Sequence, residues 1–301
     1  MDKEKTAIER LRLASDMSIR LYKKSLIVTT SGGKDSSVCV ALAQRAGIPF
    51  EVMHNHTTTD APETVYFVRS ELKRLENLGI KCEVTFPTYR GISVSMWSLI
   101  PMKLFPPSRR KRYCCEIFKE RGGEGRYIAT GVRWAESKKR QKGRGIYEVS
   151  HRDEKKRIIL KNDNDDQRRL FETCTIQRKR VCNPIVDWTD AEVWDYLTSE
   201  KIPVNPLYKC GFDRVGCIGC PLANTDIRQT EFMLYPQYKG LYISAFSRML
   251  MERRRRRADG SLTTELLIYD DPQITAEDVF HLWLGDIIPG QMRFDDLEDD
   301  V

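Results

Sequence analysis

The sequence predicts an open α/β fold built on a parallel sheet, and three observations support that class. Short β-branched runs alternate with helical segments through the first two thirds of the chain. A loop with two glycines joins the first such run to the first such helix. Strands that alternate with helices pair in parallel through right-handed crossovers. With 301 residues and 41% hydrophobic side chains, the chain can supply a large core, which excludes wholesale disorder.

The expected sheet has five strands. The first is the run SLIVTT, and a glycine turn and a helix ending at Gly47 follow it. The next helix opens at Pro62 and ends at Gly79, so it separates the second strand from the third. The five strands are expected at 25–30, 50–54, 81–86, 126–132 and 181–188.

The last third of the chain is predicted to be helical. A capping box at Thr189 and Glu192 opens one helix, and Thr275 caps a final short one. Between them lies a long helix at about 236–257 that ends in five arginines. The acidic tail 295–301 is expected to fray.

Two regions are therefore expected. Residues 1–200 form the α/β domain, and residues 201–301 form a Cys-rich loop followed by helices. The charged stretch 141–181 has little hydrophobic periodicity and is expected to be an excursion on the surface, with a hairpin as one shape.

Charge and cysteine content narrow the setting. The net charge of +7 suggests an anionic partner. No apolar run is long enough to span a bilayer, and the charged first residues do not look like a signal peptide. We therefore expect a cytoplasmic protein whose nine cysteines are metal ligands, reactive thiols or core residues rather than disulfides.

The strongest motif is Ser31-Gly32-Gly33-Lys34-Asp35-Ser36, between a strand and a helix. The two glycines permit a tight turn that points N–H groups into one concavity, and the helix adds its positive end. Serine hydroxyls add donors. The result is a cradle suited to a phosphate chain, although the spacing is not that of a Walker A loop. A glycine turn that binds nothing is the alternative.

This motif resembles the PP-loop of the ATP pyrophosphatases and sulfonucleotide reductases, the adenine-nucleotide alpha hydrolases of the phosphoadenosine phosphosulfate reductase family. TGVRWAESKKR (130–140) resembles the second family signature. NPIVDWTDAEVWDYL (183–197), IPVNPLY (202–208) and FDRVGCIGCP (212–221) resemble the third. The resemblance covers about 25–221 and implies a Rossmann-like five-stranded parallel sheet that binds ATP or a related adenine nucleotide.

The second signature suggests further ligand contacts. Gly131 permits a close backbone approach at the carboxyl end of the sheet, where open α/β sheets bind ligands. Arg133 can offer a planar fork to phosphate oxygens, and Ser137 can add a hydroxyl; Arg140 is left open. Asp35 is a candidate Mg²⁺ ligand, or alternatively only a helix cap. We assign Asp35, Arg133 and Ser137 as the catalytic candidates.

Five cysteines compete for one metal site. Cys217 and Cys220 form a CxxC turn, and Cys114 and Cys115 are adjacent in sequence. That pattern resembles the 4Fe–4S site of adenylyl-sulfate reductases, whereas adding Cys210 resembles the spacing in the DNA phosphorothioation sulfurtransferase. The resemblance implies that four of the five hold a 4Fe–4S cluster, with the fifth free as a sulfur carrier; zinc is the alternative metal.

Histidines and basic clusters are weaker signals. His54 and His56 follow the second strand and can either contact the nucleotide or simply belong to a polar loop. Three basic clusters, 108–112, 138–144 and 253–257, can serve a nucleic-acid backbone or can be solvated faces.

Three functions follow. The first is an ATP pyrophosphatase-type sulfurtransferase that adenylylates an acceptor, DNA or tRNA, for sulfur supplied by a cysteine desulfurase. The second is a reductase of adenylyl sulfate or its 3′-phosphate. Such reductases carry a C-terminal nucleophilic cysteine in a short E-C-G-[LI]-H motif, but no cysteine follows Cys220 here. The third is a non-catalytic nucleic-acid-binding iron–sulfur subunit. Oligomeric state is left open.

Overall fold

The computed structural model describes residues 2–120, 122–150, 157–163, 171, 179–262 and 267–285. The chain divides into two compact units. The first unit combines Met1–Asn55, Pro62–Thr85 and Arg121–Val215, and the second combines His56–Ala61, Phe86–Glu120 and Gly216–Val301. The domain boundary expected at residue 200 stays a prediction. Within the described ranges, none of the helices has the length and apolarity needed to cross a bilayer.

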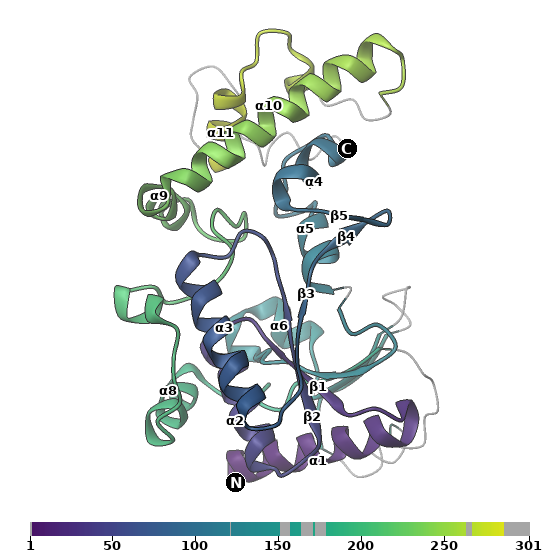
Figure 1. The fold of residues 1–301 in the computed structure, drawn as a ribbon, viewed down its shortest axis with the longest axis vertical. Helices are drawn as coiled ribbons and strands as arrows, with labels where there is room; N and C mark the ends of the chain where they lie inside the picture. Colours follow the sequence, from purple (N-terminus) through teal and green to yellow (C-terminus); the bar gives the residue numbers. More distant parts are fainter. Residues whose placement is uncertain are drawn as a thin grey trace. The chain divides into compact units, whose positions relative to one another are not determined.

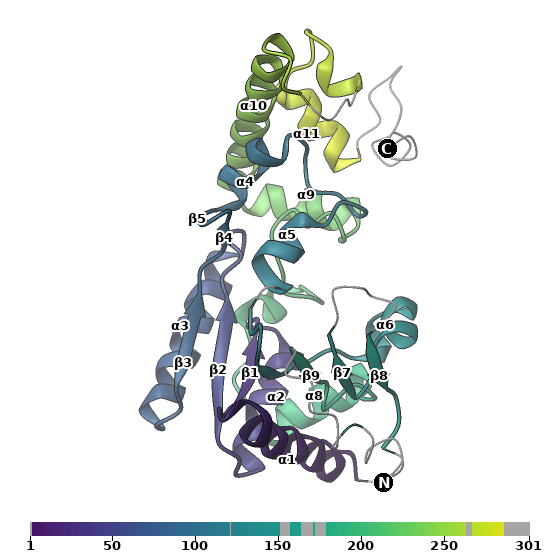
Figure 2. The same ribbon diagram turned by 90° about the vertical axis from the view of Figure 1, so that its right-hand side faces the viewer.

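A seven-stranded sheet in the order β3-β2-β1-β6-β9-β7-β8 forms the centre of the first unit (Figures 1 and 2). Its first five members in that order are all parallel, as the sequence predicted. They are β3 (Cys82–Thr85), β2 (Phe50–Asn55), β1 (Leu26–Thr30), β6 (Tyr127–Ala129) and β9 (Arg180–Cys182).

The charged excursion contributes two further strands. β7 (Tyr147–Val149) pairs antiparallel with β9, and β8 (Ile158–Leu160) pairs antiparallel with β7. The hairpin is therefore part of the sheet, and all three residues of β7 are buried. Glu148 can be fully buried because Arg144 and Arg157 pair with its carboxylate. The charged residues of this stretch predicted a surface position, and for this reason the buried strand was not predicted.

Both faces of the sheet are covered. Leu26 and Val28 of β1 belong to the large core, whereas the alternate residue Ile27 packs in a separate cluster with Met53 and Ile128. This two-sided burial is typical of parallel sheets. Among the described residues, the helices of the unit that have full bounds are α1 (Lys3–Tyr22), α2 (Lys34–Arg45), α3 (Pro62–Asn77), α6 (Lys138–Gly143) and α8 (Asp190–Ser199). Two short 3-10 helices accompany them, η2 (Trp134–Glu136) and η4 (Pro206–Cys210).

The helix α1 was not predicted from the sequence. It packs against α2, β1 and β6 through a stripe that includes Ala7, Leu11 and Ala14. These positions recur at helical spacing, so the signal was present between charged side chains. Arg10 on this helix is buried and pairs with Asp187 at 2.8 Å, which ties α1 to the loop before α8.

The second unit is mainly helical (Figure 1). Its long helix α10 (Pro236–Ala258) packs against α4 (Met96–Lys103), α9 (Thr225–Leu234) and α11 (Ala276–Leu284), and α4 was not predicted. The elements are β4 (Thr88–Tyr89), β5 (Ile92–Ser93), α4 (Met96–Lys103), α5 (Tyr113–Cys115), the π-helix η1 (Glu116–Glu120), α9 (Thr225–Leu234), α10 (Pro236–Ala258), the 3-10 helix η5 (Leu267–Asp270) and α11 (Ala276–Leu284). The acidic tail and Cys174 lie outside the described residues.

Candidate functional site

The glycine loop lies where predicted, between β1 and α2. Gly32 has φ +74°, and a Cβ there would lie 2.7 Å from the Val68 side chain, so both conformation and space require glycine. Gly33 is the N-cap of α2 and offers no side-chain cap. The positive end of this helix therefore opens directly onto the loop.

Hydroxyl groups hold the loop in shape. The Ser31 amide donates to Ser36 Oγ at 3.2 Å, and Ser36 Oγ donates to the Gly33 carbonyl at 2.8 Å. The Gly32 amide donates to Thr30 Oγ1 at 3.3 Å. Ser36 is thus a structural residue of the cradle in this arrangement, whereas Ser31 is exposed.

Two residues from the 202–208 motif complete the loop. Asn205 Nδ2 donates to the Gly32 carbonyl at 3.3 Å, and the Lys34 amide donates to Tyr208 Oη at 2.9 Å. Asn205 is 1% exposed. The motif resembles a family signature, but its sequence predicted no role for either residue. Only the tertiary structure brings Asn205 and Tyr208 to the loop.

Gly131 and Arg133 lie against the same helix start. A Cβ on Gly131 would lie 2.8 Å from the carbonyl carbon of Asp35, so glycine is needed for this close approach. Arg133 is 1% exposed; its Nε donates to Asp35 Oδ1 at 2.7 Å, and its Nη2 pairs with Asp190. Arg133 therefore acts here as a clamp between α2 and α8, and its expected phosphate contact stays a prediction.

Asp35 is surrounded by cations. Besides Arg133, Lys34 Nζ lies 3.8 Å from its other carboxylate oxygen. Burial raises the pKa of Asp35, and both cations oppose that rise. In this arrangement the carboxylate stabilises Lys34 and Arg133 rather than offering a free ligand, so its role toward Mg²⁺ stays a prediction.

The rest of the second signature forms a helix start. Ser137 caps α6 by accepting from the Arg140 amide at 3.2 Å. The Arg140 guanidinium pairs with Glu136, whose carboxylate also accepts from the Arg133 amide at 3.0 Å. These contacts fold the segment after β6 without involving a ligand, so the catalytic assignment of Ser137 remains untested.

Four of the five competing cysteines lie together in the second unit. The pKa of Cys114 is raised by its hydrogen bond to Cys115, by burial and by the neighbouring thiols of Cys217 and Cys220. The same Cys114 contact lowers the pKa of Cys115, and Arg112 Nη2, 3.5 Å from the Cys115 sulfur, adds to the effect. The sequence pairs 114–115 and 217–220 thus meet although about a hundred residues separate them.

The CxxC turn is built tightly. Gly219 has φ +70°, and its amide donates to Glu231 Oε2 at 2.7 Å. The Cys220 amide donates to the Cys217 carbonyl at 3.3 Å. Cys217 is also the β-bridge partner of Asp60, so the turn is supported from both sides.

A single zinc ion and a 4Fe–4S cluster are the two metal groups that these four thiols could hold. A single tetrahedral Zn²⁺ with Zn–S bonds of about 2.3 Å brings its sulfurs to about 3.8 Å from one another. In the described ranges, no three cysteine sulfurs lie within 4.8 Å of one another. A 4Fe–4S cluster, in which each thiolate would hold its own iron atom, and a single zinc ion both stay predictions for these four thiols.

The other cysteines differ in place. Cys210 is exposed and belongs to the first unit, at the end of η4. Cys39 and Cys182 are fully buried in the core of that unit, where burial raises the pKa of each thiol. Cys82 is half-buried on β3.

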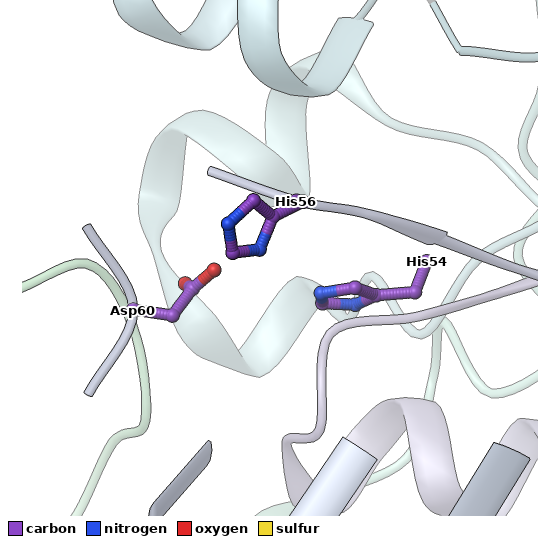
Figure 3. Close-up of side chains that lie close together, drawn as sticks. All are labelled: His54, His56 and Asp60. Carbon is purple, nitrogen blue, oxygen red and sulfur yellow. The ribbon is translucent and has the colours of Figure 1, made fainter. Parts of the chain in front are cut away.

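The two histidines belong to different units. His54 ends β2, is 6% exposed, and places Nδ1 2.9 Å from the Thr30 carbonyl. His56 stacks edge-on with Phe86 in the second unit. A ring nitrogen of His56 and a carboxylate oxygen of Asp60 lie within 4.8 Å of each other (Figure 3). A nucleotide contact by either histidine stays a prediction.

The cluster 253–257 is not a free basic face. Arg253 is fully buried and pairs with Asp270 at 2.7 Å. Arg254 donates to the Pro272 and Ile274 carbonyls, and Arg255 pairs with Glu252. Arg253 and Arg254 hold α10 to the segment that follows it, whereas the pair between Arg255 and Glu252 lies within α10. In the cluster 108–112, Arg109 donates to the Pro221 carbonyl at 3.0 Å, so part of that cluster is also structural.

Comparison with protein families identifies the chain. The model described as phosphoadenosine phosphosulfate reductase domain matches residues 25–223, which hold the glycine loop and all five candidate cysteines. The chain belongs to this family. The recognition made from the motifs is thereby confirmed.

Similar proteins show how far the likeness extends. An uncharacterised protein of Methanocaldococcus jannaschii is 31% identical over 66% of this chain and 36% of its own length. Sulfate adenylyltransferase subunit 2 of Saccharophagus degradans is 27% identical over 60% of this chain and 59% of its own. The chain thus spans about a third of the first relative and three fifths of the second. Among solved structures, the phosphoadenylyl-sulfate reductase of Candida auris superposes with a TM-score of 0.45 at 16% identity, covering 70% of this chain and 88% of that one.

Proposed function

We propose that the protein is a PP-loop ATP pyrophosphatase that adenylylates an acceptor and replaces the activated oxygen with sulfur. The observation that carries the proposal is the glycine loop, closed by Asn205 and Tyr208, on the start of α2. Its backbone N–H groups and helix end suit the pyrophosphate that such a reaction releases. An adenine nucleotide is the expected ligand of a loop of this family.

The residues of the loop have separate tasks in this reaction. Ser31, exposed at the loop, can donate its hydroxyl to a phosphate oxygen. Lys34 neutralises charge that develops on the leaving group, and it is held in place by Asp35 and by Asp190 at 3.5 Å. Positioning and charge stabilisation carry most of the catalysis in phosphoryl and nucleotidyl transfer.

Cys114, Cys115, Cys217 and Cys220 are the proposed ligands of a 4Fe–4S cluster in the second unit. When bound, such a cluster supplies electron transfer or holds the fold together. Cys210 is left as an exposed thiol in the first unit and is the candidate sulfur carrier, with a cysteine desulfurase as donor. The proposed acceptor is a nucleic acid, because the net charge of +7 favours an anionic partner. DNA is the first candidate and tRNA the second.

The nucleotide part is tested by product analysis with matched serine variants. ATP should yield pyrophosphate rather than orthophosphate. Ser31→Ala should weaken ATP binding by about three- to tenfold, because it removes one hydrogen bond worth roughly 1 kcal/mol. Ser37→Ala is the control, since the Ser37 hydroxyl donates to the Gly33 carbonyl at 3.3 Å. Equal ATP affinity in both variants and in the wild type would remove the loop from the site.

The cluster is tested by iron and sulfide analysis after anaerobic purification. Cys220→Ser should lose both elements, whereas Cys210→Ser should retain them, because Cys210 lies outside the four-thiol group. Stoichiometric zinc without sulfide in the wild type would refute the iron–sulfur assignment.

A reductase of adenylyl sulfate is the second candidate, and the family match favours it to the same degree. Residues 221–301 hold no cysteine, so none of them supplies the nucleophilic thiol that such reductases use. Release of sulfite from adenylyl sulfate, together with no turnover of ATP, would establish the reductase instead. Binding of nucleic acid with neither activity would favour a non-catalytic subunit.

A further inference from the structure

A polar cavity of about 300 Å³ lies within the second unit, next to the CxxC turn. The start of α9, the end of α11 and the two chain segments that contain Ser108 and Pro221 surround it. The polar side chains that line it are Ser108, Arg109, Thr225 and Arg228. No acidic side chain lines it in the part of the chain that the structure describes.

Arg228 is the unusual member of this lining. It is 5% exposed, and its guanidinium stacks 4.1 Å from the centre of the Trp283 ring. Nη1 donates to the Trp283 and Leu284 carbonyls at 2.9 and 3.3 Å. Nε and Nη2 are buried and have no acceptor among the described residues. A buried cation with unmet donors is costly unless an anion joins it.

The neighbouring charges do not meet that need. Burial lowers the pKa of Arg228 to about 10, and Arg109, a second cation, adds to the effect. Glu231 lies one turn further along α9, but its carboxylate accepts from the Gly219 amide at 2.7 Å. Among the described residues, Arg109 Nε and Nη2 donate to the backbone carbonyls of Pro221 and Ala223 and to no carboxylate. The cavity therefore carries two positive charges without a carboxylate in its lining.

We propose that this cavity is a binding site for a tetrahedral oxyanion, the phosphate or sulfate group of a ligand. The cavity is large enough for such a group, and Arg228 and Arg109 supply forked donors. Nε and Nη2 are closed to solvent in this structure, so the guanidinium has to turn before they can donate to the anion. The Thr225 hydroxyl and the start of α9, which Asn224 leaves without a side-chain cap, add further donors.

The cavity lies in the same unit as the four thiols. Pro221 and Ala223, whose carbonyls hold Arg109, follow Cys220 by one and three residues in the sequence. An oxyanion bound there would lie within the same unit as the four thiols. The inference does not depend on the proposed nucleotide chemistry, because every lining residue lies outside the glycine loop and its unit.

The test uses a readout that belongs to this cavity alone. Phenylglyoxal modifies accessible arginines, and mass spectrometry of the peptides identifies which ones react. Inorganic phosphate or sulfate should protect Arg109, which is exposed at the cavity. Arg248, exposed on α10 and outside the cavity, is the internal control and should react equally with and without the anion.

Arg228→Gln should raise the phosphate concentration needed for half-protection of Arg109 by at least about tenfold. Charge-assisted hydrogen bonds are worth roughly 1.5–3 kcal/mol, and 1.4 kcal/mol corresponds to a factor of ten. Arg248→Gln should leave the protection unchanged. If Arg228→Gln does not fold, Thr225→Val should still weaken protection. Unchanged protection in a folded Arg228→Gln protein, or no protection of wild-type Arg109, would overturn the proposal.

A separate arm of the same experiment identifies the kind of molecule that carries the oxyanion. Inorganic phosphate, adenylyl sulfate and a short DNA duplex are compared at equal concentrations of phosphate groups. Protection by the duplex that falls steeply with salt would identify a backbone phosphate. Protection by the small anions alone would identify a free or nucleotide-borne group.

Discussion

At the scale of single residues, Arg133 shows how a predicted ligand contact becomes a structural clamp. Arg133→Gln should lower the free energy of unfolding by about 3 kcal/mol, because it leaves Asp35 partly buried beside Lys34 without its main partner. Urea denaturation measures this loss. Arg140→Gln, in the same segment but about a third exposed, should cost under about 1 kcal/mol. Equal losses would show that Arg133 is not the clamp.

Tyr208 is the other residue whose role only the structure assigns. Tyr208→Phe removes the acceptor of the Lys34 amide and should cost about 1 kcal/mol of stability. It should also change ATP affinity, because that amide belongs to the phosphate cradle. Isothermal titration with ATP measures the effect. Tyr238→Phe, which loses a 2.7 Å bond to a carbonyl in the second unit, is the control and should leave ATP affinity unaltered.

At the scale of elements, arginines at the end of α10 stabilise the second unit by holding this helix to residues 270–274. Arg253→Gln should cost about 3–5 kcal/mol, since it removes the buried guanidinium that pairs with the buried Asp270 carboxylate. Arg255→Gln breaks only exposed pairs with Glu252 and Asp259 and should cost less than about 1 kcal/mol. Thermal unfolding of the two variants should therefore differ by many degrees. Similar losses of stability in the two variants would show that these arginines form a solvated face instead.

The capping box of α8 predicts a pH dependence. A hydrogen bond from Lys3, joined by the Thr189 amide, lowers the pKa of Glu192 to about 2. A depressed carboxyl pKa stabilises the fold above its ordinary value near 4.5, and that stabilisation is lost as pH falls toward 2. Glu192→Gln keeps the cap but not the charge. Between pH 5 and pH 2, the wild type should therefore lose about 0.5–1 kcal/mol more than this variant, a small amount because both partners are over a third exposed.

Acid denaturation followed by circular dichroism measures that difference. Asp195→Asn, on the same helix, is the control because no ion pair is found for Asp195 among the described residues, and it should track the wild type more closely. A Glu192→Gln protein with the same acid sensitivity as the wild type would contradict the assignment.

At the scale of the whole molecule, the net charge of +7 is expected to serve a nucleic-acid acceptor. In the cluster 108–112, Arg109 contacts the Pro221 carbonyl and Arg112 contacts Cys115, so these two are kept, and Arg110 and Lys111 are changed. Arg110→Gln with Lys111→Gln should flatten the salt dependence of DNA binding by about 0.9 log unit for each DNA phosphate that these side chains no longer neutralise.

Lys23→Gln with Lys24→Gln removes the same charge from the end of α1 and is the control. Fluorescence anisotropy at several salt concentrations measures both slopes. Negligible binding by the wild type at about 50 mM salt would remove the nucleic-acid acceptor, and a small-molecule acceptor would then take its place.

The sequence by itself determined the parallel sheet, the glycine loop, the capped helices α8 and α11, and the family. These depend on local patterns: β-branched runs, glycines that permit a tight turn, and capping boxes that are complete within four residues. The position of the loop between β1 and α2 followed directly, because strand, turn and helix are adjacent in the chain.

Only the tertiary structure decided which distant residues meet. Buried charges misled the sequence reading, since Glu148 and Arg253 look like surface residues until their partners are known. Asn205 and Tyr208 reach the loop across more than 170 residues, and the 114–115 and 217–220 cysteine pairs come together across about a hundred. Such contacts depend on how elements pack rather than on local propensity, so no window of sequence contains them.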